Sequence, residues 1–345
     1  MAVTLPLGSA IDVLYESRDA ARADPALRRR LEDVQAILAE DLGWVEQALA
    51  ELSEQGVSPA TEAAQHLVRR GGKRVRPLTM LLSSACFGKI PASVRRVAMV
   101  TELVHSATLL HDDVADEGMV RRGVVSSRLL WGNAVSVLSG DLLLVHALTQ
   151  THEHAPEIMP ELLATMRDLV DGEVIQLRGR TALDLSEETY ERILRGKTAS
   201  LFVFAARSGA RLADAPPEAQ DALAAFGLAL GMAFQLVDDV LDYSGERSGK
   251  TLAADLREGK LTLPLVLATR RDARLVELVR RIHAGDQEPI ELVRQGVVES
   301  GACREARDRA AQYTERALGS LAQLPPSPSR SLLERVALEL VERAR

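Results

Sequence analysis

The sequence has few cysteine and aromatic residues, and both shortages exclude classes of function. Its 345 residues include 2 cysteines, Cys86 and Cys303. They form no CxxC or Cys/His pattern, so the sequence indicates neither a disulfide framework nor a zinc site, and it fits a reducing cytoplasm. Phenylalanine, tyrosine and tryptophan number 5, 4 and 2. This scarcity disfavours a protein that stacks single-stranded nucleic acid on aromatic platforms.

An excess of positive charge is also absent. The chain carries 42 basic and 49 acidic side chains, a formal net charge of −7. A general polyanion binder is therefore disfavoured, and an anionic ligand must be bound by a local group of cations or through metal ions. The composition, 46% hydrophobic and 26% charged, is typical of a folded soluble protein.

No hydrophobic run is long enough to predict an integral membrane segment. The most apolar stretch, 222–234, is shorter than the roughly 18 residues that a membrane-spanning helix needs. We expect it to form a helix that is buried in a large core. The start of the chain contains Asp12, Glu16 and Asp19, so it is not typical of a secretory signal.

Helix signals dominate the sequence. Proline is absent from 92–155, 161–215 and 218–263, which leaves room for long unbroken helices. Apolar residues also recur at helical spacings of three and four, and strand-like alternation is nearly absent. The predicted fold class is therefore all-α.

The domain organisation follows from the same pattern. We expect an N-terminal extension at 1–29 and a single helical domain over 30–345. Within that domain, a proline-rich turn at 324–329 precedes a final helix at 331–345.

An acidic motif ends one apolar helical run, in the segment Leu109–Asp116 (LLHDDVAD). On an α-helix Asp112 and Asp116 share a face, with Asp113 about 100° round the axis. Three carboxylates this close repel each other unless a cation lies among them, and hard oxygen ligands suit Mg²⁺. The alternative is a solvated acidic helix end.

The same spacing returns after the stretch 222–234. Asp238 and Asp242 share a helix face, and Asp239 flanks them. Carboxylates on the wall of an apolar bundle are costly unless they bind something. Two DDxxD motifs, each ending an apolar helix, therefore predict a paired metal site whose halves face one cavity.

Basic residues accompany both motifs. Each one alone is most simply a solvated surface cation. Together they supply the donors that two diphosphates need. They are Lys73, Arg74 and Arg76 after two glycines, Arg121 and Arg122 after the first motif, Lys197 in mid-chain, and Lys250 and Lys260 after the second motif.

With these motifs the sequence resembles a trans-polyprenyl diphosphate synthase of the isoprenyl synthetase type. The resemblance spans about 30–345. Its stretches are GGKRVRP, LLHDDVADEGMVRRG, GEVIQL, GKTASLF, FQLVDDVLDYSG, GKTLAADLREGKLTLPL and the basic ending VERAR. It implies one helical bundle of the isoprenoid synthase type with a central cavity. It also implies a Mg²⁺-dependent prenyltransferase that condenses isopentenyl diphosphate onto an allylic diphosphate.

The resemblance also implies roles for individual residues. For isopentenyl diphosphate these are Lys73, Arg76, His105 and Arg122. For Mg²⁺ they are Asp112 and Asp116, with Asp113 nearby, and Asp238, with Asp239 and Asp242 around it. For the allylic diphosphate they are Arg121, Lys197, Thr198, Gln235, Lys250 and, as a weaker candidate, Lys260. The residues expected to be catalytic are Asp112, Asp113, Asp116, Lys197, Asp238 and Asp239. Without the resemblance, His105 is most simply a satisfied buried histidine.

The length of the product is expected to depend on the helix that carries the first motif. In the family the product grows down a tunnel beside this helix. Ala107 and Thr108 lie about one turn before the motif and Val104 a turn further, and none is aromatic. We therefore expect a long-chain product, from hexaprenyl to decaprenyl diphosphate. The alternative is that Met99 or Leu143 closes the tunnel nearer to the first motif, so that the enzyme makes farnesyl or geranylgeranyl diphosphate.

Other readings of the motifs are a non-catalytic regulatory subunit of a heteromeric synthase, a terpene cyclase and a helical scaffold. The two intact DDxxD motifs disfavour the regulatory subunit. The isopentenyl segment GGKRVRP disfavours the cyclase. Buried aspartates beside apolar helices disfavour the scaffold. The resemblance further implies a homodimer. The few aromatic residues and the negative net charge indicate that nucleic acid is not a partner.

Overall fold

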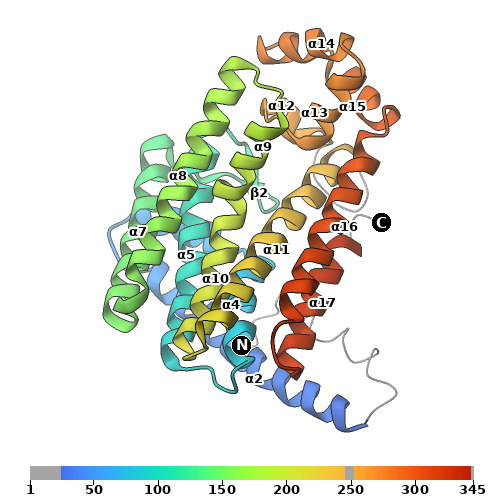
Figure 1. The fold of residues 1–345 in the computed structure, drawn as a ribbon. Helices are drawn as coiled ribbons and strands as arrows, with labels where there is room; N and C mark the ends of the chain where they lie inside the picture. Colours follow the sequence, from blue (N-terminus) through green and yellow to red (C-terminus); the bar gives the residue numbers. More distant parts are fainter. Residues whose placement is uncertain (1–24, 245–251, 343–345) are drawn as a thin grey trace. The chain divides into compact units, whose positions relative to one another are not determined.

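The computed structural model describes residues 25–244 and 252–342, and this part of the chain consists of helices joined by turns and loops, with one short β-hairpin (Figure 1). The all-α fold class is confirmed. The chain divides into two compact units, each built from more than one segment. Unit 1 comprises 1–162, 205–223 and 323–335, and unit 2 comprises 163–204, 224–322 and 336–345. The expectation of one domain over 30–345 stays a prediction.

Unit 1 is organised around one long buried helix, α5 (Ala92–Ala115), which packs against α2, α4 and α7. α5 begins directly after Pro91, because proline is compatible with the start of a helix but not with its interior. The other elements are α2 (Pro25–Ser53), α3 (Ala60–Val68), α4 (Val75–Ala85), β1 (Val120–Arg121), β2 (Val124–Val125), α6 (Ser127–Trp131), α7 (Asn133–His154) and η1 (Pro156–Ile158).

Unit 2 has an apolar core formed by α11, α13, α15 and α16, with Val240, Tyr243 and Leu265 among its fully buried side chains. Its elements are α9 (Glu187–Ile193), the π-helix η2 (Leu194–Ala199), α12 (Ala254–Arg257), α13 (Leu263–Arg271), α14 (Arg274–His283), α15 (Ile290–Glu299) and α16 (Ala302–Leu321). Helices with residues in both units are α8 (Met159–Ala182), α10 (Ser200–Leu212), α11 (Pro217–Ser244) and α17 (Pro328–Glu342).

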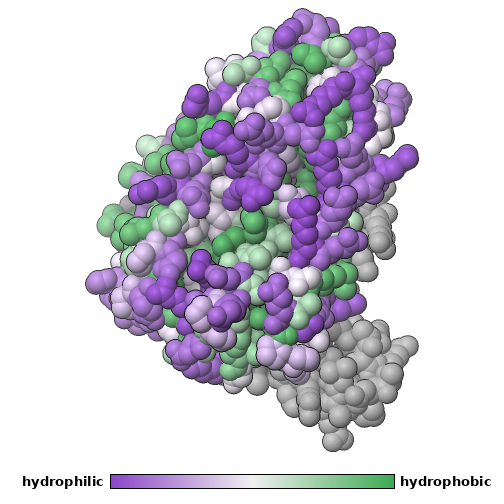
Figure 2. All heavy atoms as spheres, viewed as in Figure 1, coloured by the Kyte–Doolittle hydropathy of each residue, from purple (hydrophilic) through white to green (hydrophobic). Residues whose placement is uncertain are grey.

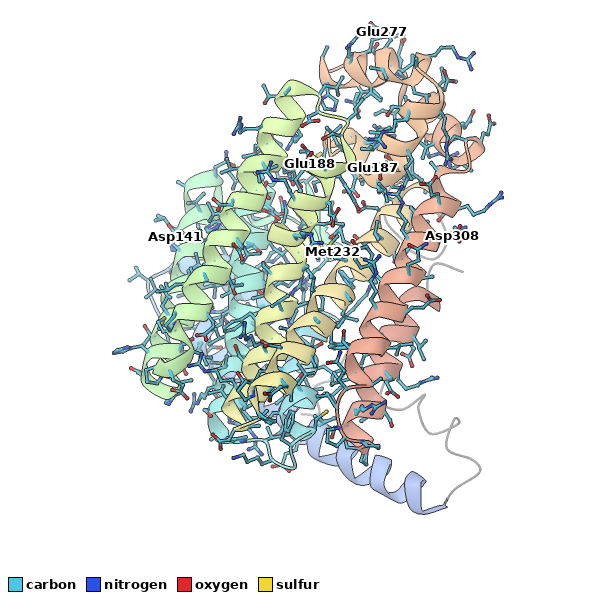
Figure 3. All side chains as sticks on the ribbon, in the orientation of Figure 1. Asp141, Glu187, Glu188, Met232, Glu277 and Asp308 are labelled. Atoms are coloured by element: carbon cyan, nitrogen blue, oxygen red, sulfur yellow. The ribbon has the colours of Figure 1, made fainter. Side chains whose placement is uncertain are left out.

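An ion-pair bridge fixes α9 within unit 2. Glu187 on α9 accepts hydrogen bonds from Arg270 of α13 and Arg309 of α16. Figure 3 labels Glu187 on this helix. The hydrogen bond from Arg309 and the charges of both arginines lower the pKa of Glu187. The bridge therefore holds α9 against two helices of the core.

The apolar stretch 222–234 lies in α11, where Phe226, Leu230 and Met232 are buried, as predicted. By length and composition α11 and α7 could each cross a membrane. The most apolar window of α11 is 67% buried, which identifies it as a core helix, whereas that of α7 is 33% buried.

One local prediction needs correction. The last helix begins at Pro328 rather than at 331, because proline is well tolerated in the first turn of a helix. The start of α4 lies inside the segment GGKRVRP. α4 begins at Val75, and Arg74 before it has a left-handed backbone with φ 47°.

Candidate active site

The first aspartate motif lies at the C-terminal end of α5. Asp113 is 1% exposed and Asp116 is also buried, while Asp112 is half-buried. α5 ends at Ala115, and the backbone N–H of Asp116 donates to the carbonyl oxygen of Asp112 at 2.8 Å. One helical turn therefore separates Asp112 from Asp116, which agrees with the prediction from their spacing.

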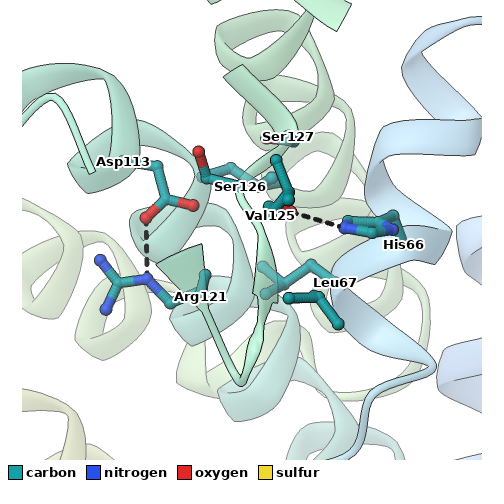
Figure 4. Close-up of a pocket in the computed structure, with 9 residues that line it drawn as sticks. His66, Leu67, Asp113, Arg121, Val125, Ser126 and Ser127 are labelled. Carbon is teal, nitrogen blue, oxygen red and sulfur yellow. Dashed lines mark hydrogen bonds and ion pairs between the residues drawn. The ribbon is translucent and has the colours of Figure 1, made fainter. Parts of the chain in front are cut away.

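The β1–β2 hairpin places Arg121 beside this motif. Nε of Arg121 donates to Oδ1 of Asp113 at 2.7 Å (Figure 4). In the same small pocket, Nε2 of His66 lies 2.9 Å from the carbonyl oxygen of Val125 in β2. Both strands of the hairpin are thus held. The arginine expected to bind the allylic diphosphate contacts the first motif directly.

A buried carboxylate, Glu102 on α5, lies among basic side chains of unit 1. Its side chain is 3% exposed and forms ion pairs with Arg74 and, at 3.2 Å, with Arg122. Burial by itself raises the pKa of Glu102, but nearby positive charge outweighs burial and lowers this pKa to about 2. The charges responsible are those of Arg74, Arg122 and Arg76, and His105 adds to them only when it is protonated. Glu102 is therefore anionic among the side chains expected to bind isopentenyl diphosphate.

The protonation of these side chains follows from burial. Burial lowers the pKa of Arg76 to about 10 and the pKa of His105 well below its usual value, although Glu102 opposes both shifts. At neutral pH Arg76 therefore carries its charge and His105 is neutral. A neutral imidazole offers one N–H donor and one acceptor nitrogen. Lys73, the remaining expected ligand, is exposed.

The second aspartate motif lies near the C-terminal end of α11 in unit 2. Asp239 is 2% exposed and accepts hydrogen bonds from the hydroxyl of Tyr190 at 2.6 Å and from Nε2 of Gln235 at 2.9 Å. Burial, and then the charge of Asp255, raise the pKa of Asp239 to about 7. A cation at this place would favour the charged form, so the carboxyl fits a metal site.

The other two aspartates of this motif lie in the same helix. Asp242 accepts from the backbone N–H groups of Ala254 at 3.0 Å and Asp255 at 3.2 Å. Asp238 lies one turn before Asp242, as the spacing predicts.

Lys197 and Thr198 lie in the π-helix η2, which forms where two backbones approach closely. A Cβ atom on Gly172 of α8 would lie 2.6 Å from the backbone nitrogen of Lys197, and one on Gly196 would lie 2.6 Å from the carbonyl oxygen of Asp168. Glycine at both positions permits this contact. Nζ of Lys197 pairs with Glu173.

A chain of hydrogen bonds links η2 to the second motif. Oγ1 of Thr198 donates to Oε1 of Gln235 at 2.9 Å, and Gln235 in turn donates to Asp239. The structure therefore brings together three residues that were expected to bind the allylic diphosphate or metal. Lys260 pairs with Glu258 at 2.6 Å and lies 3.7 Å from Asp255. Lys250 lies outside the described residues.

The donor chemistry of both motifs suits a hard divalent cation. Within 38–244 and 252–339, no group of three His, Cys, Asp or Glu side chains could hold a metal ion by itself. Mg²⁺ commonly takes one or two carboxylates and completes its shell with water and substrate phosphates. Because the motifs belong to different units, the expectation that they face one cavity stays a prediction.

Sequence analysis assigned no functional role to three residues of the site: Arg74, Glu102 and Tyr190. Glu102 had a signal, because it is a lone acidic residue inside the apolar run of α5. Arg74 was noted only as one of three neighbouring cations. Tyr190 carries no signal in its sequence neighbourhood.

Residues 58–298 match the polyprenyl synthetase family. The chain belongs to this family. It is 35% identical over 323 residues to the octaprenyl diphosphate synthase of Escherichia coli (strain K12), covering 91% of this chain and 99% of that protein. It is 36% identical over 322 residues to the all-trans-nonaprenyl-diphosphate synthase (geranyl-diphosphate specific) of Rhodobacter capsulatus, covering 90% and 98%.

Solved structures agree with this assignment. A decaprenyl diphosphate synthase from Rhodobacter capsulatus has a TM-score of 0.84 at 36% identity, with 91% of this chain and 99% of that chain covered. A polyprenyl synthase from Caulobacter crescentus CB15, solved with calcium and isoprenyl diphosphate, has a TM-score of 0.84 at 34% identity, with 99% and 100% covered. The polyprenyl synthetase therefore has the isoprenoid synthase fold and is a prenyltransferase, a polyprenyl diphosphate synthase, as predicted.

Proposed function

We propose that this polyprenyl synthetase condenses isopentenyl diphosphate head-to-tail onto an allylic diphosphate and makes a long-chain trans-polyprenyl diphosphate. The observation that carries the proposal is the cation cluster around Glu102, in a chain that also has both aspartate motifs. A diphosphate without a resident metal ion needs direct Lys and Arg donors, and this cluster provides them.

The cluster is the proposed site of the isopentenyl diphosphate. Lys73, Arg76 and Arg122 neutralise its phosphates, and neutral His105 donates one hydrogen bond without adding charge. Because Glu102 stays anionic, it opposes the mutual repulsion of the arginines before the substrate binds.

The allylic diphosphate is assigned to the other set of residues. Mg²⁺ would be held by Asp112 and Asp116 and by Asp238 and Asp242, with Asp113 and Asp239 beside them. When bound, it supplies Lewis-acid stabilisation of the charge on the departing diphosphate. Direct donors to the same group would be Arg121, Lys197, Thr198, Gln235, Lys250 and Lys260.

The reaction needs no nucleophilic side chain. The allylic C–O bond breaks and its electron pair leaves with diphosphate. The alkene of isopentenyl diphosphate then attacks the allylic cation to form the new C–C bond. A proton is lost to restore a double bond, and the departing diphosphate is the proposed base. The residues named above bind and orient both substrates for this sequence.

A long product is favoured by the side chains before the first motif. Val104 and Ala107 are fully buried and small or medium in size. The hydroxyl of Thr108 donates to the carbonyl oxygen of His105 at 2.8 Å. None of the three is an aromatic plug. The relatives reported above carry octaprenyl, nonaprenyl and decaprenyl products in their names.

A homodimer is supported by exposed apolar side chains on α6 and α7. Figure 2 shows apolar surface near the edge that α7 occupies in Figure 1. The side chains exposed by 37–58% are Leu129, Leu130, Val137, Leu138 and Val145. Such patches commonly mark contact surfaces, and a two-fold dimer covers the same patch on both copies.

A cytoplasmic location is part of the same proposal. Both cysteines are free thiols, and Cys303 is buried. Burial raises the pKa of the Cys86 thiol to about 12, so that thiol is unreactive.

The purified chain, incubated alone with isopentenyl and farnesyl diphosphates and Mg²⁺, tests the proposal by chromatography of the products. We expect hexaprenyl to decaprenyl diphosphate. An exclusive farnesyl or geranylgeranyl product would identify a short-chain synthase. Activity that appears only with a second subunit would identify a heteromeric component, and consumption of the allylic substrate without isopentenyl diphosphate would identify a cyclase.

A further inference from the structure

Arg74 differs from the cations on either side of it. Lys73 is exposed and Arg76 is half-buried, but Arg74 is 5% exposed. Its backbone is left-handed, with φ 47° and ψ 31°, directly before the first residue of α4. A residue with a side chain is disfavoured in this conformation, because its Cβ atom lies too close to the following carbonyl oxygen, so other contacts must offset the cost.

The guanidinium of Arg74 supplies those contacts by joining two helices. Nε and Nη2 bind the two carboxylate oxygens of Glu46 on α2, the latter at 2.9 Å, and Nη1 binds Glu102 on α5. This is a planar fork that holds three oxygen atoms at once. A lysine ammonium is a single point charge and cannot reproduce it.

Arg74 also shares Glu102 with Arg122. Nη2 of Arg122 donates to the same oxygen of Glu102 at 3.2 Å, and its Nη1 donates to the carbonyl oxygen of Leu67 at 3.1 Å. A Cβ atom on Gly72 would lie 3.2 Å from Nη2 of Arg122. The turn before α4, Glu102 and the Arg122 side chain are therefore packed as one group.

We propose that Arg74 is a positioning residue of the isopentenyl diphosphate site. By joining Glu46 to Glu102, it fixes the turn that presents Lys73 and Arg76. This inference rests on the proposed function, since it assumes that these two cations bind isopentenyl diphosphate. Arg74 also neutralises the Glu102 carboxylate through their ion pair. Without it the carboxylate is left to pair with Arg122, and a substrate phosphate must compete for that cation.

Glu46→Gln is the first test, because Glu46 is 27% exposed and the substitution keeps its shape. Steady-state kinetics should show KM for isopentenyl diphosphate raised about fivefold, as expected for one weakened charged hydrogen bond. The kcat and the KM for farnesyl diphosphate should stay within about twofold of the wild type. Arg74→Lys should raise the same KM further, by about tenfold or more.

The matched control is Glu51→Gln, the same substitution on α2 at an exposed site that accepts a hydrogen bond from Gln47. It should change neither KM. The proposal is overturned if Glu46→Gln leaves the KM for isopentenyl diphosphate unchanged, or raises both KM values by the same factor. If Arg74→Lys does not fold, Glu46→Gln decides alone. Failure of the proposed function is a separate result, because then the wild type itself incorporates no isopentenyl diphosphate.

Discussion

Single buried carboxylates beside specific donors organise the chemistry in both units. Asp113 is paired with Arg121, Glu102 with Arg74 and Asp239 with Tyr190. Removing one partner of such a pair takes a hydrogen bond from a buried carboxylate, although Glu102 keeps Arg122 and Asp239 keeps Gln235. Conservative changes at these residues should therefore alter substrate or metal binding before they alter the fold.

The first prediction concerns Asp112. Asp112→Ala removes a carboxylate proposed to hold Mg²⁺, so kcat should fall by about 10²–10³-fold, the size expected for losing one electrostatic contact to the leaving group. The assay is incorporation of labelled isopentenyl diphosphate. Asp308→Ala, at an exposed site on α16 that Figure 3 labels, should retain full activity. Near-normal turnover of the Asp112 variant would refute its assignment.

The second prediction concerns Tyr190, whose hydroxyl orients Asp239. Tyr190→Phe should raise the Mg²⁺ concentration for half-maximal activity by about tenfold, because partners that orient metal ligands tune metal affinity. Tyr313→Phe serves as the control, since Tyr313 lies in the same unit and its ring lies against the guanidinium of Arg316. An unchanged Mg²⁺ requirement in Tyr190→Phe would contradict the prediction.

Residue spacing predicted only part of this picture. Asp112 and Asp116 could be placed on one turn because the helical period fixes which residues share a face. The hydrogen-bond partner of Asp239 could not be predicted, because Tyr190 is 49 residues away in the sequence and no local pattern links the two residues. The left-handed backbone of Arg74 is likewise set by tertiary contacts rather than by its own preference.

At the scale of elements, close backbone contacts and small residues position the helices that carry the site. The contact between α8 and η2 depends on Gly172 and Gly196. The hairpin β1–β2 was not predicted, because its strands have two residues each and show no measurable alternation. The long helices were predictable, since proline-free stretches define them.

The third prediction tests the glycine contact. Gly172→Ala should destabilise the enzyme by about 1–3 kcal/mol, because the added Cβ would overlap the backbone of Lys197 and force η2 to move. KM for the allylic substrate should rise as well. Gly319→Ala in α16, where nothing lies within 4 Å of the added atom, should be neutral or slightly stabilising. Urea unfolding compares the two, and equal stability would contradict the account.

The fourth prediction concerns α5 and the length of the product. Ala107→Phe should shorten the main product toward farnesyl or geranylgeranyl diphosphate, because a bulky ring would block growth beside this helix. Since Ala107 is fully buried, thermal unfolding must show that the variant is folded. Chromatography of the products is the measurement, and an unchanged chain length in a folded variant would contradict the tunnel assignment.

At the scale of the whole molecule, the sequence predicted the all-α class and the family, but not the division into two compact units. α8, α10, α11 and α17 have residues in both units, so no linker or change in composition marks the boundaries. The apolar face of α7 was not predicted either, because its composition is close to that of a core helix.

The fifth prediction tests whether that face joins two copies of the chain. Val145→Glu places a charge on a side chain that is 57% exposed and proposed to be covered in the dimer, so light scattering should show a shift from dimer to monomer. Val57→Glu, at a site that is 80% exposed in the turn after α2, should leave the dimer intact. A dimer that is unaffected by Val145→Glu would exclude this part of α7 from the interface.

The central claim is that acidic side chains of both motifs bind Mg²⁺ to remove diphosphate from an allylic carbon. It is tested most directly by following incorporation of labelled isopentenyl diphosphate by the purified enzyme, first after chelation of all divalent cations and then after addition of Mg²⁺. The account predicts that incorporation stops on chelation and returns with Mg²⁺ in the wild type but not in Asp238→Asn. Undiminished incorporation in the metal-free enzyme would contradict it.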